Sequence, residues 1–204
     1  MCSRYFMEEH MDEELLRDLQ GSFRSTYGPT GGLSVPDGIF RARDVHPSDE
    51  APTVCTIHGV PELRGMHWGY PSQQGKGLII NARAESVPEK PMFRRGVESR
   101  RIILPASGFY EWNAQKEKNI FRNRAGRILY MAGICDLFSD GARFVIVTTA
   151  ASDCMRPVHE RMPLILDPDQ LEDWLYDSTA AEDILRSTPA LLEREMPYEQ
   201  LSLF

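Results

Sequence analysis

The chain has 204 residues, of which 42% are hydrophobic, so it is long enough for one domain with a buried core and too short for a second domain of full size. It carries 23 Lys and Arg against 30 Asp and Glu, and the net charge of −7 argues against a non-specific binder of polyanions. Basic residues nevertheless cluster in two pairs, which leaves a local basic face possible: Arg94, Arg95, Arg100 and Arg101.

The four cysteines are spaced like neither a disulfide framework nor a zinc site, and no C-x-x-C pair occurs. The first residues lack the apolar segment of a secretory signal, and no run approaches the length needed to cross a bilayer. We therefore expect a reduced, soluble, cytoplasmic protein, and the sequence implies no metal or organic cofactor.

In the first half of the chain, Met11–Phe23 carries leucines at helical spacing and predicts an amphipathic helix. A Gly- and Pro-rich connection follows over Tyr27–Gly38. Beyond it, turn residues separate four short runs rich in β-forming residues. These runs are Ile39–Ala42, Thr53–Val60, Gly65–Tyr70 and Leu78–Ala82.

The second half begins with a short predicted helix over Met92–Val97. Three further strand-like runs follow: Arg101–Trp112, Ile128–Phe138 and Ala142–Ala150. Asp167 suits the N-cap of a helix that ends at Tyr176, and Ser178 or Thr179 could cap another that ends at Leu185. These elements predict one α+β domain over residues 1–197, with a mixed, barrel-like β-sheet core flanked by a few helices, and a separate tail over residues 198–204.

Cys2 is the first candidate for chemistry. Because its side chain is small, Met1 can be removed, and residue 2 then presents an α-amine and a thiol together. The amine has a reference pKa of about 7.7–8.0, so much of it is free near neutral pH and can condense with an aldehyde to a Schiff base. The thiol can then close a thiazolidine ring, favoured by proximity. The alternative is that a cysteine stands at position 2 by chance.

Three distant motifs bear on that choice. In Ile-Asn-Ala-Arg-Ala-Glu-Ser, the side chains of Asn81, Arg83 and Glu85 alternate onto one face of a strand. Three polar groups directly after an apolar run are not typical of a core, although a solvated sheet edge would explain them equally well.

The other two motifs place polar groups beside apolar strands. In Leu-Pro-Ala-Ser-Gly-Phe-Tyr-Glu-Trp, Glu111 lies between two aromatic residues, where a carboxyl group can donate or accept a proton near pH 7. An exposed glutamate at a strand end is the alternative. In Val-His-Glu-Arg-Met-Pro, His159 could transfer protons and Arg161 could bind phosphate. A hydrogen-bonded structural histidine is the plainer interpretation of His159.

Together, Met-Cys at the start, Asn-Ala-Arg-Ala-Glu, Gly-Phe-Tyr-Glu-Trp and His-Glu-Arg-Met-Pro resemble the SRAP (SOS response-associated peptidase) family of abasic-site-shielding proteins. The resemblance covers nearly the whole chain, and four motifs in this order and spacing are specific. It implies an SRAP-like fold and a covalent sensor and shield of abasic sites in single-stranded DNA. The product would be a thiazolidine crosslink through Cys2, formed after Met1 is removed.

The resemblance also implies a role for each catalytic residue. Cys2 would attack the opened sugar, and it would act as a thiol autopeptidase if Met1 leaves by self-cleavage. Asn81 would position Cys2, and Glu111 would move protons during Schiff-base formation and Met1 removal. His159 would act on the ring oxygen of the sugar and so favour the open aldehyde.

The remaining implied contacts are with DNA. Arginines would hold backbone phosphates without reading sequence, and two further side chains would stack on or wedge against the bases beside the lesion. The phosphate contacts are Arg4, Arg83 and Arg161, the base contacts are Trp68 and Pro47, and Thr148 matches a further DNA-contacting position.

The chain departs from the family pattern in three places. Ser3 stands where glycine is usual, which adds bulk beside the reactive terminus. Pro91 stands where a basic residue commonly precedes the Met-Phe pair, so one phosphate contact is open to doubt. The C-terminal segment is also shorter than the usual family ending and unlike it.

The tail Gln-Leu-Ser-Leu-Phe is similar to the bacterial sliding-clamp-binding pentapeptide. The clamp-binding residues would be Gln200, Leu201, Leu203 and Phe204. Leu203 and Phe204 would enter an apolar pocket of the clamp while Gln200 makes polar contacts, with an affinity on the order of micromolar. The alternative is that the same apolar residues pack on the domain as a final strand.

Two other functions fit parts of the sequence. Cys2 and His159 could be the nucleophile and base of a cysteine peptidase that acts on other proteins. The chain could also read single-stranded DNA without chemistry, in which case Cys2→Ala would keep all activity. A covalent binder would instead keep reversible binding in that variant and lose the crosslinked product.

Overall fold

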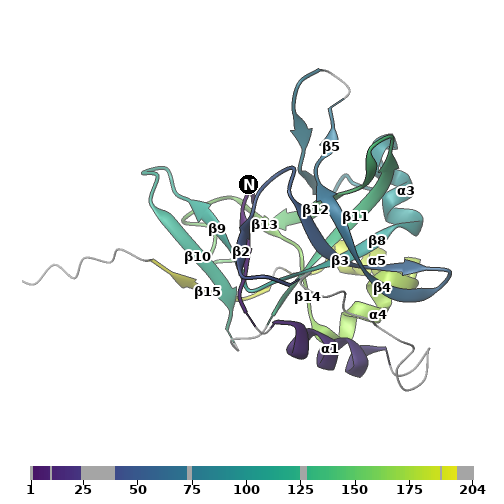
Figure 1. Ribbon diagram of the computed structural model, residues 1–204. Helices are drawn as coiled ribbons and strands as arrows, with labels where there is room; N and C mark the ends of the chain where they lie inside the picture. The colour runs from purple at the N-terminus through teal and green to yellow at the C-terminus, as the bar shows by residue number, and fades with distance from the viewer. Residues whose placement is uncertain are drawn as a thin grey trace, which may run out of the picture.

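The computed structural model of the chain describes residues 2–9, 11–23, 40–72, 75–124, 128–188 and 190–196. Five strands form a closed ring of pairings (Figure 1). β3 pairs antiparallel with β4 and β8, β8 with β11, and β11 with β12, and β12 returns to β4 in parallel. Closure leaves these five strands without a free edge along the paired segments, and it confirms the expected mixed, barrel-like sheet. They are β3 (Glu50–Ile57), β4 (Val60–Trp68), β8 (Arg101–Ala106), β11 (Leu129–Phe138) and β12 (Gly141–Ala150).

Short strands extend the barrel by pairing with the part of β12 that lies beyond its pairing with β4. β7 (Asn81–Arg83) pairs parallel with the far half of β12, and β13 (Arg161–Pro163) pairs antiparallel with the end of β12. β14 (Ile165–Leu166) pairs with β11, and β5 (Tyr70–Pro71) pairs with β6 (Leu78–Ile79) in a separate ribbon. β12 thus brings the Asn-Ala-Arg and His-Glu-Arg motifs to one end of the barrel.

A second sheet lies beside the barrel and contains the N-terminal strand. Its strand order is β15-β10-β9-β1-β2, and all its pairings are antiparallel. The strands are β1 (Tyr5–Met7), β2 (Arg43–Val45), β9 (Gly108–Trp112), β10 (Lys118–Asn123) and β15 (Leu192–Glu195).

The chain passes from the barrel to this second sheet at Ser107, so the single strand predicted over Arg101–Trp112 is two strands, β8 and β9. A side chain at Gly108 would not fit, because its Cβ would lie 2.6 Å from the carbonyl oxygen of Phe121 and 2.6 Å from the ring of Phe6. Only glycine allows β9 to approach its neighbours this closely directly after the change of sheet.

Other strand predictions also shift. β3 and β4 are joined by a turn at His58 and Gly59, whose φ angles are 50° and 79°, inside the run predicted as one strand. Residues 40–42 are not in a strand, and the nearby strand is β2; Ile39 lies outside the described residues.

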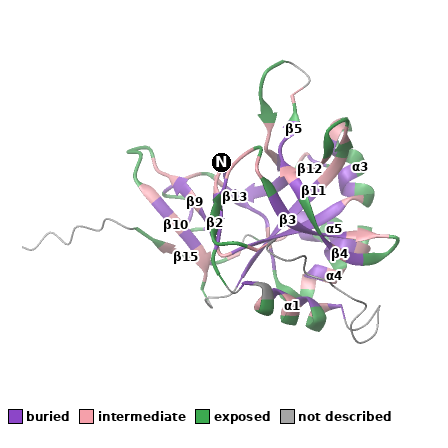
Figure 2. Cartoon of the chain, viewed as in Figure 1, coloured by how far each residue is buried: buried purple, intermediate pink, exposed green. Residues whose placement is uncertain are grey.

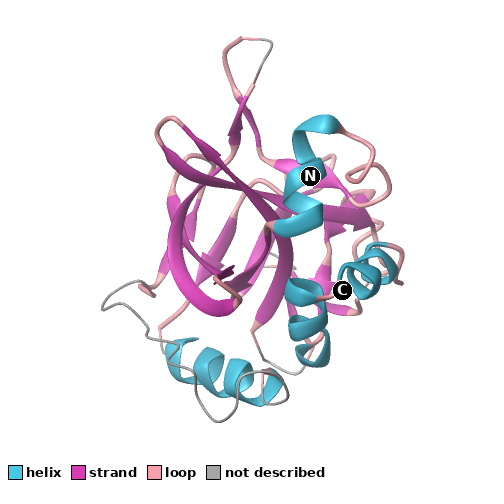
Figure 3. Ribbon diagram, turned by 90° about the vertical axis from the view of Figure 1, so that its right-hand side faces the viewer, coloured by secondary structure: helices cyan, strands magenta, loops and turns pink. Residues whose placement is uncertain are grey.

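The helices cover the barrel from below and from one side (Figure 3). They are α1 (Met11–Ser22), α3 (Pro91–Ser99), the 3-10 turn η1 (Pro168–Gln170), α4 (Leu171–Tyr176) and α5 (Ser178–Leu185). The predicted helices are therefore present, but Asp177 caps α5 through hydrogen bonds from the amides of Thr179 and Ala180, in place of Ser178 or Thr179. Within the described residues, no helix combines the length and the apolar character that a membrane span requires.

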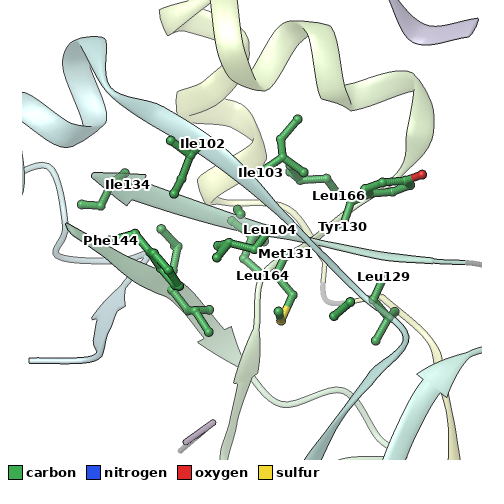
Figure 4. Close-up of a cluster of buried hydrophobic side chains, with 14 of the residues drawn as sticks. Ile102, Ile103, Leu104, Leu129, Tyr130, Met131, Ile134, Phe144, Leu164 and Leu166 are labelled. Carbon is green, nitrogen blue, oxygen red and sulfur yellow. The ribbon is translucent and has the colours of Figure 1, made fainter. Parts of the chain in front are cut away.

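Burial concentrates in the barrel strands and the helix faces that touch them (Figure 2). Ile102 and Leu104 of β8 pack with Met131 and Ile134 of β11 and with Phe144 of β12 in the cluster of Figure 4. Each fully buried side chain of this size contributes roughly 1.5–3 kcal/mol relative to exposure. This core holds the barrel rigid, so the loops and strand ends at its rim can position side chains precisely.

Candidate functional site

Cys2 lies three residues before the start of β1 and is only 1% exposed. Its thiol donates to the carbonyl oxygen of Arg4 across 3.9 Å. Burial, and next the Glu111 carboxylate, raise the pKa of the Cys2 thiol to about 12. At physiological pH the sulfur is therefore held as a neutral thiol beside a carboxyl group.

Asn81 fixes the backbone of Cys2 from the first position of β7. Its Nδ2 donates a hydrogen bond to the carbonyl oxygen of Cys2 across 2.9 Å. The side-chain oxygen of Asn81 is buried and has no hydrogen-bond partner in the part of the chain that the structure describes. Asn81 therefore holds the terminus in place and keeps one acceptor beside it.

Glu111 reaches the same place from β9. β1 and β9 are antiparallel, with Tyr5 opposite Phe109, and the amide of Tyr110 donates to the carbonyl oxygen of Arg4 across 3.0 Å. Glu111 is buried on the core face of β9, whereas Tyr110 and Trp112 lie on the other face and are half-buried. The structure thus brings Cys2, Asn81 and Glu111 together from three separate segments.

His159 is half-buried and precedes β13. The backbone N–H of Arg161 donates to His159 Nδ1 across 3.0 Å. Because Nδ1 accepts, the proton of the neutral ring lies on Nε2, which is then a donor. No hydrogen bond links His159 to Cys2 or Asn81 among the described residues. β12 pairs both with β7, which begins at Asn81, and with β13, which begins two residues after His159.

Arg161 is held by Glu85, a partner that the sequence reasoning did not identify. Nη1 and Nη2 of Arg161 donate to the two carboxylate oxygens of Glu85 at 2.6 and 2.9 Å, and Nη2 also donates to the carbonyl oxygen of Thr148 at 2.6 Å. The Arg161 side chain is 13% exposed and that of Glu85 is 54% exposed. The hydrogen bonds from Arg161 hold the pKa of Glu85 below its usual value.

Three further candidates for DNA contact are at the surface. Arg4 is half-buried, 3.9 Å from Asp44, and its guanidinium carbon lies 5.3 Å from the centre of the Trp112 ring. Arg83 is exposed and lies opposite Thr148 in the pairing of β7 with β12. Pro47 is half-buried in the turn after β2. All three have surface that a ligand could reach.

Two predicted DNA contacts are wrong. Trp68 is 0% exposed, its indole N–H donates to the carbonyl oxygen of Ile80 across 2.9 Å, and its ring packs on Phe144 and Tyr5. No base can stack on a ring inside the core. Thr148 is also 0% exposed, and its hydroxyl is directed at the carbonyl oxygen of Ala82, so its contribution is the backbone oxygen that holds Arg161.

Sequence comparison identifies the family. A family profile described as SOS response associated peptidase (SRAP) matches residues 1–202. The chain belongs to the SRAP family. The abasic site processing protein YoaM of Bacillus subtilis (strain 168) is 36% identical over 167 residues, which are 74% of this chain and 74% of the relative. The abasic site processing protein YedK of Escherichia coli (strain K12) is 27% identical over 198 residues, which are 90% of this chain and 83% of the relative.

Solved structures share the fold of this chain. A phage-related protein from Bordetella bronchiseptica superposes with a TM-score of 0.74 at 21% identity, covering 96% of this chain and 93% of that chain. A protein from Bacteroides thetaiotaomicron superposes with a TM-score of 0.72 at 23% identity, covering 97% and 93%.

Parts of the predicted SRAP site lie outside the described residues. These are Met1 and the tail residues Gln200, Leu201, Leu203 and Phe204. Within the described residues, no three His, Cys, Asp or Glu side chains are grouped so that they could hold a metal ion.

Proposed function

We propose that this SRAP protein forms a covalent crosslink to abasic sites in single-stranded DNA through Cys2 once Met1 has been removed. The observation that carries the proposal is the convergence on Cys2. Asn81 holds its backbone at 2.9 Å, and the Glu111 carboxylate acts on its thiol. The names of the relatives YoaM and YedK, both abasic site processing proteins, support the substrate.

The raised pKa of the thiol gives the reaction an order. The α-amine attacks the C1′ aldehyde of the opened sugar first, and loss of one water gives the imine. The sulfur then adds to the imine carbon, and its proton passes through Glu111 to the nitrogen. The product is a five-membered thiazolidine, and the only molecule released is water. Neither step needs an oxidant or a metal ion.

In this proposal His159 helps to open the sugar ring, which produces the aldehyde. An abasic deoxyribose exists mainly as a closed ring, so the C1′–O4′ bond must break before the amine can attack. The Nε2–H that results from the hydrogen bond at Nδ1 can donate a hydrogen bond to O4′ as that bond breaks. The proton of the C1′ hydroxyl passes through water to O4′, so the ring opens with no net gain or loss of a proton. Arg4, Arg83 and Arg161 hold the neighbouring phosphates, with Pro47 beside the lesion.

Removal of Met1 uses the same thiol in this proposal. The Cys2 sulfur attacks the carbonyl carbon of Met1, the peptide bond to the Cys2 nitrogen breaks, and that nitrogen takes up a proton. Water then hydrolyses the thioester and releases methionine, which leaves a free amine and a free thiol. Glu111 is the nearby carboxyl group that can accept and return the proton.

The test combines intact-mass spectrometry with a denaturing gel, before and after addition of single-stranded DNA that carries one abasic site. We expect loss of Met1 and an adduct equal to the protein plus DNA minus one water. Cys2→Ala should bind reversibly without an adduct, whereas Cys154→Ala, which changes a half-buried thiol elsewhere, should crosslink normally. An adduct that retains Met1 would overturn the proposal, and cleavage of a foreign peptide would favour a peptidase.

We also propose that Gln200, Leu201, Leu203 and Phe204 bind the bacterial sliding clamp, and that the protein acts as a monomer near the nucleoid. The support is the pentapeptide sequence itself. In a clamp pull-down, a variant with Leu203 and Phe204 changed to Ala should lose recovery. Leu191→Ala, which changes a leucine that is exposed on the domain, is the matched control. Equal recovery of all three proteins would reject the clamp as a partner.

A further inference from the structure

The core face of the second sheet carries a polar pair of side chains next to an aromatic pair. In the antiparallel pairing of β9 with β10, Phe109 lies opposite Phe121, and Glu111 lies opposite Asn119. The two phenylalanine rings stack with their centres 5.2 Å apart. The polar pair is buried as well, since Glu111 is 6% and Asn119 is 0% exposed. Opposite residues on one face have Cβ atoms about 4.5–5.5 Å apart, so the amide of Asn119 lies beside the carboxyl group of Glu111.

The amide of Asn119 is held from two directions. Its Nδ2 donates a hydrogen bond to the carbonyl oxygen of Glu117 across 2.9 Å, and its Oδ1 accepts one from Nε of Arg194 across 2.8 Å. A buried amide destabilises the fold unless it is hydrogen-bonded, and these two bonds offset that cost. They also set which end of the amide faces the arginine. Nδ2 is turned away from Arg194, and its second hydrogen is left for another acceptor.

Arg194 reaches Asn119 from β15, the outer strand of this sheet (Figure 1). It lies opposite Phe121 in the pairing of β15 with β10, so its half-buried side chain is on the core face, next to that of Asn119. Its Nη2 donates to the sulfur of Met196 across 3.0 Å. Arg194 forms no ion pair with any described residue. Its hydrogen bond to Asn119 therefore links β15 to the buried polar pair.

We infer that Asn119 and Arg194 are positioning residues for Glu111. Asn119 directs the carboxyl group of Glu111 toward Cys2, and Arg194 keeps the Asn119 amide in the orientation that does so. The inference rests on the proposed function, in which Glu111 moves protons to and from Cys2. An inverted amide would turn its oxygen toward the carboxylate, and two acceptors cannot bond to each other. β15 thereby contributes to the site a residue that no sequence motif indicated.

The first test measures crosslinking to single-stranded DNA that carries one abasic site, at several concentrations of excess DNA. The limiting rate reports the chemical step, and the DNA concentration at half that rate reports binding. Asn119→Leu and Arg194→Gln should each lower the limiting rate by about fivefold to tenfold, the loss expected for one hydrogen bond. The half-saturating concentration should not change, because neither residue contacts DNA in this inference. If Asn119→Leu does not fold, Arg194→Gln, which changes a half-buried residue of the outer strand, still decides the outcome.

The losses should not multiply. Arg194 acts through Asn119, so the double variant Asn119→Leu/Arg194→Gln should be as fast as Asn119→Leu alone. In a Glu111→Gln background, Asn119→Leu should change the residual rate by less than about twofold. Arg122→Gln is the matched control, because Arg122 joins β10 to Glu195 of β15 through an ion pair of 3.5 Å on the outer face. It should crosslink like the parent, and losses that multiply would overturn the inference.

The second test needs no DNA. Burial, and then the Glu111 carboxylate, raise the pKa of the Cys2 thiol to about 12. The pH dependence of Cys2 alkylation by iodoacetamide, measured on the chain that retains Met1, therefore reports where that carboxylate lies. Asn119→Leu and Arg194→Gln should move the profile part of the way toward that of Glu111→Gln, whereas Arg122→Gln should leave it in place.

The outcomes separate the two proposals. If the wild-type protein crosslinks, and neither its limiting rate nor its alkylation profile depends on Asn119 and Arg194, the buried pair serves the sheet alone and the inference is wrong. The same holds if the variants change only the melting temperature. If the wild-type protein forms no crosslink while the alkylation profile still responds to Asn119 and Arg194, the covalent function fails and the positioning of Glu111 stands.

Discussion

The Cys2 thiol should ionise, and so become reactive, at a much higher pH than an ordinary cysteine. Burial, and then the Glu111 carboxylate, raise its pKa to about 12. Each pH unit below the pKa reduces the thiolate tenfold, so about one Cys2 side chain in 10⁴ is ionised at pH 8. A cysteine with the reference pKa of about 8.5 is roughly one quarter ionised at that pH. Alkylation of folded Cys2 should therefore be about 10³-fold slower than in the unfolded chain, before burial adds further protection.

The assay is timed reaction with iodoacetamide from pH 7 to pH 11 on the chain that retains Met1, with the Cys2 peptide quantified by mass spectrometry. The urea-unfolded chain is the reference. The logarithm of the folded rate should rise by about one per pH unit up to at least pH 11, because only the thiolate reacts. In Glu111→Gln the curve should move to lower pH, since a negative charge has been removed. A plateau at or below pH 9.5 would refute the argument that the amine must react before the thiol.

Three further predictions concern binding, rate and stability. Glu85→Gln should tighten binding of undamaged single-stranded DNA by about threefold in fluorescence anisotropy, because a phosphate no longer competes with a carboxylate for Arg161. The gain is small because Glu85 is more than half exposed, and an ion pair with such a partner is worth less than about 1 kcal/mol. Unchanged or weaker binding would contradict this competition. Asn81→Ala should slow crosslinking by roughly fivefold on a quenched gel time course, since one hydrogen bond contributes about 1 kcal/mol, and an unaltered rate would show that the bond to Cys2 does not matter. Three thiols, two of them buried and one half-buried, have raised pKa values, so the folded state keeps their protons to a higher pH than the unfolded state does. The stability that they contribute is complete below pH ~8.5 and is lost as the pH rises, by roughly 1–2 kcal/mol per thiol at pH 10. Urea denaturation at pH 7.5 and pH 10 measures this loss, and equal free energies would contradict it for Cys2, Cys55 and Cys135.

The Glu85–Arg161 pair also affects how DNA binding should be understood in this acidic protein. A bidentate carboxylate occupies the same N–H groups that a phosphate would use. Arg161 is thereby kept in one orientation, and in the proposed function intact DNA must displace Glu85 to reach it. Glu85 is more than half exposed, so it can move away at modest cost.

Several features follow from local sequence alone, for physical reasons. The helix over residues 11–22 and the pair of helices after Asp167 were predictable because helical spacing of leucines and capping residues act within a few positions. The family was predictable because four motifs keep their order and spacing. The alternation of Asn81 and Arg83 onto one strand face was likewise a local property.

Other features depend on which strands become neighbours. The run Arg101–Trp112 gave no sign that it changes sheets, because the reason is the close approach of Phe121 and Phe6 to Gly108. Trp68 looked suitable for stacking on bases, yet Phe144, Tyr5 and the carbonyl oxygen of Ile80 enclose it.

By itself, then, the sequence determined the family, the helices and the class of fold and offered the candidate reactive groups, since these depend on residue type and short spacing. Only the tertiary structure decided which of those groups meet. The antiparallel register of β1 with β9 sets Cys2 beside Glu111, and β7 places Asn81 against Cys2. The pairing register of a strand decides which of its side chains point into the core. The partner strand that sets this register is usually tens of residues away in the chain.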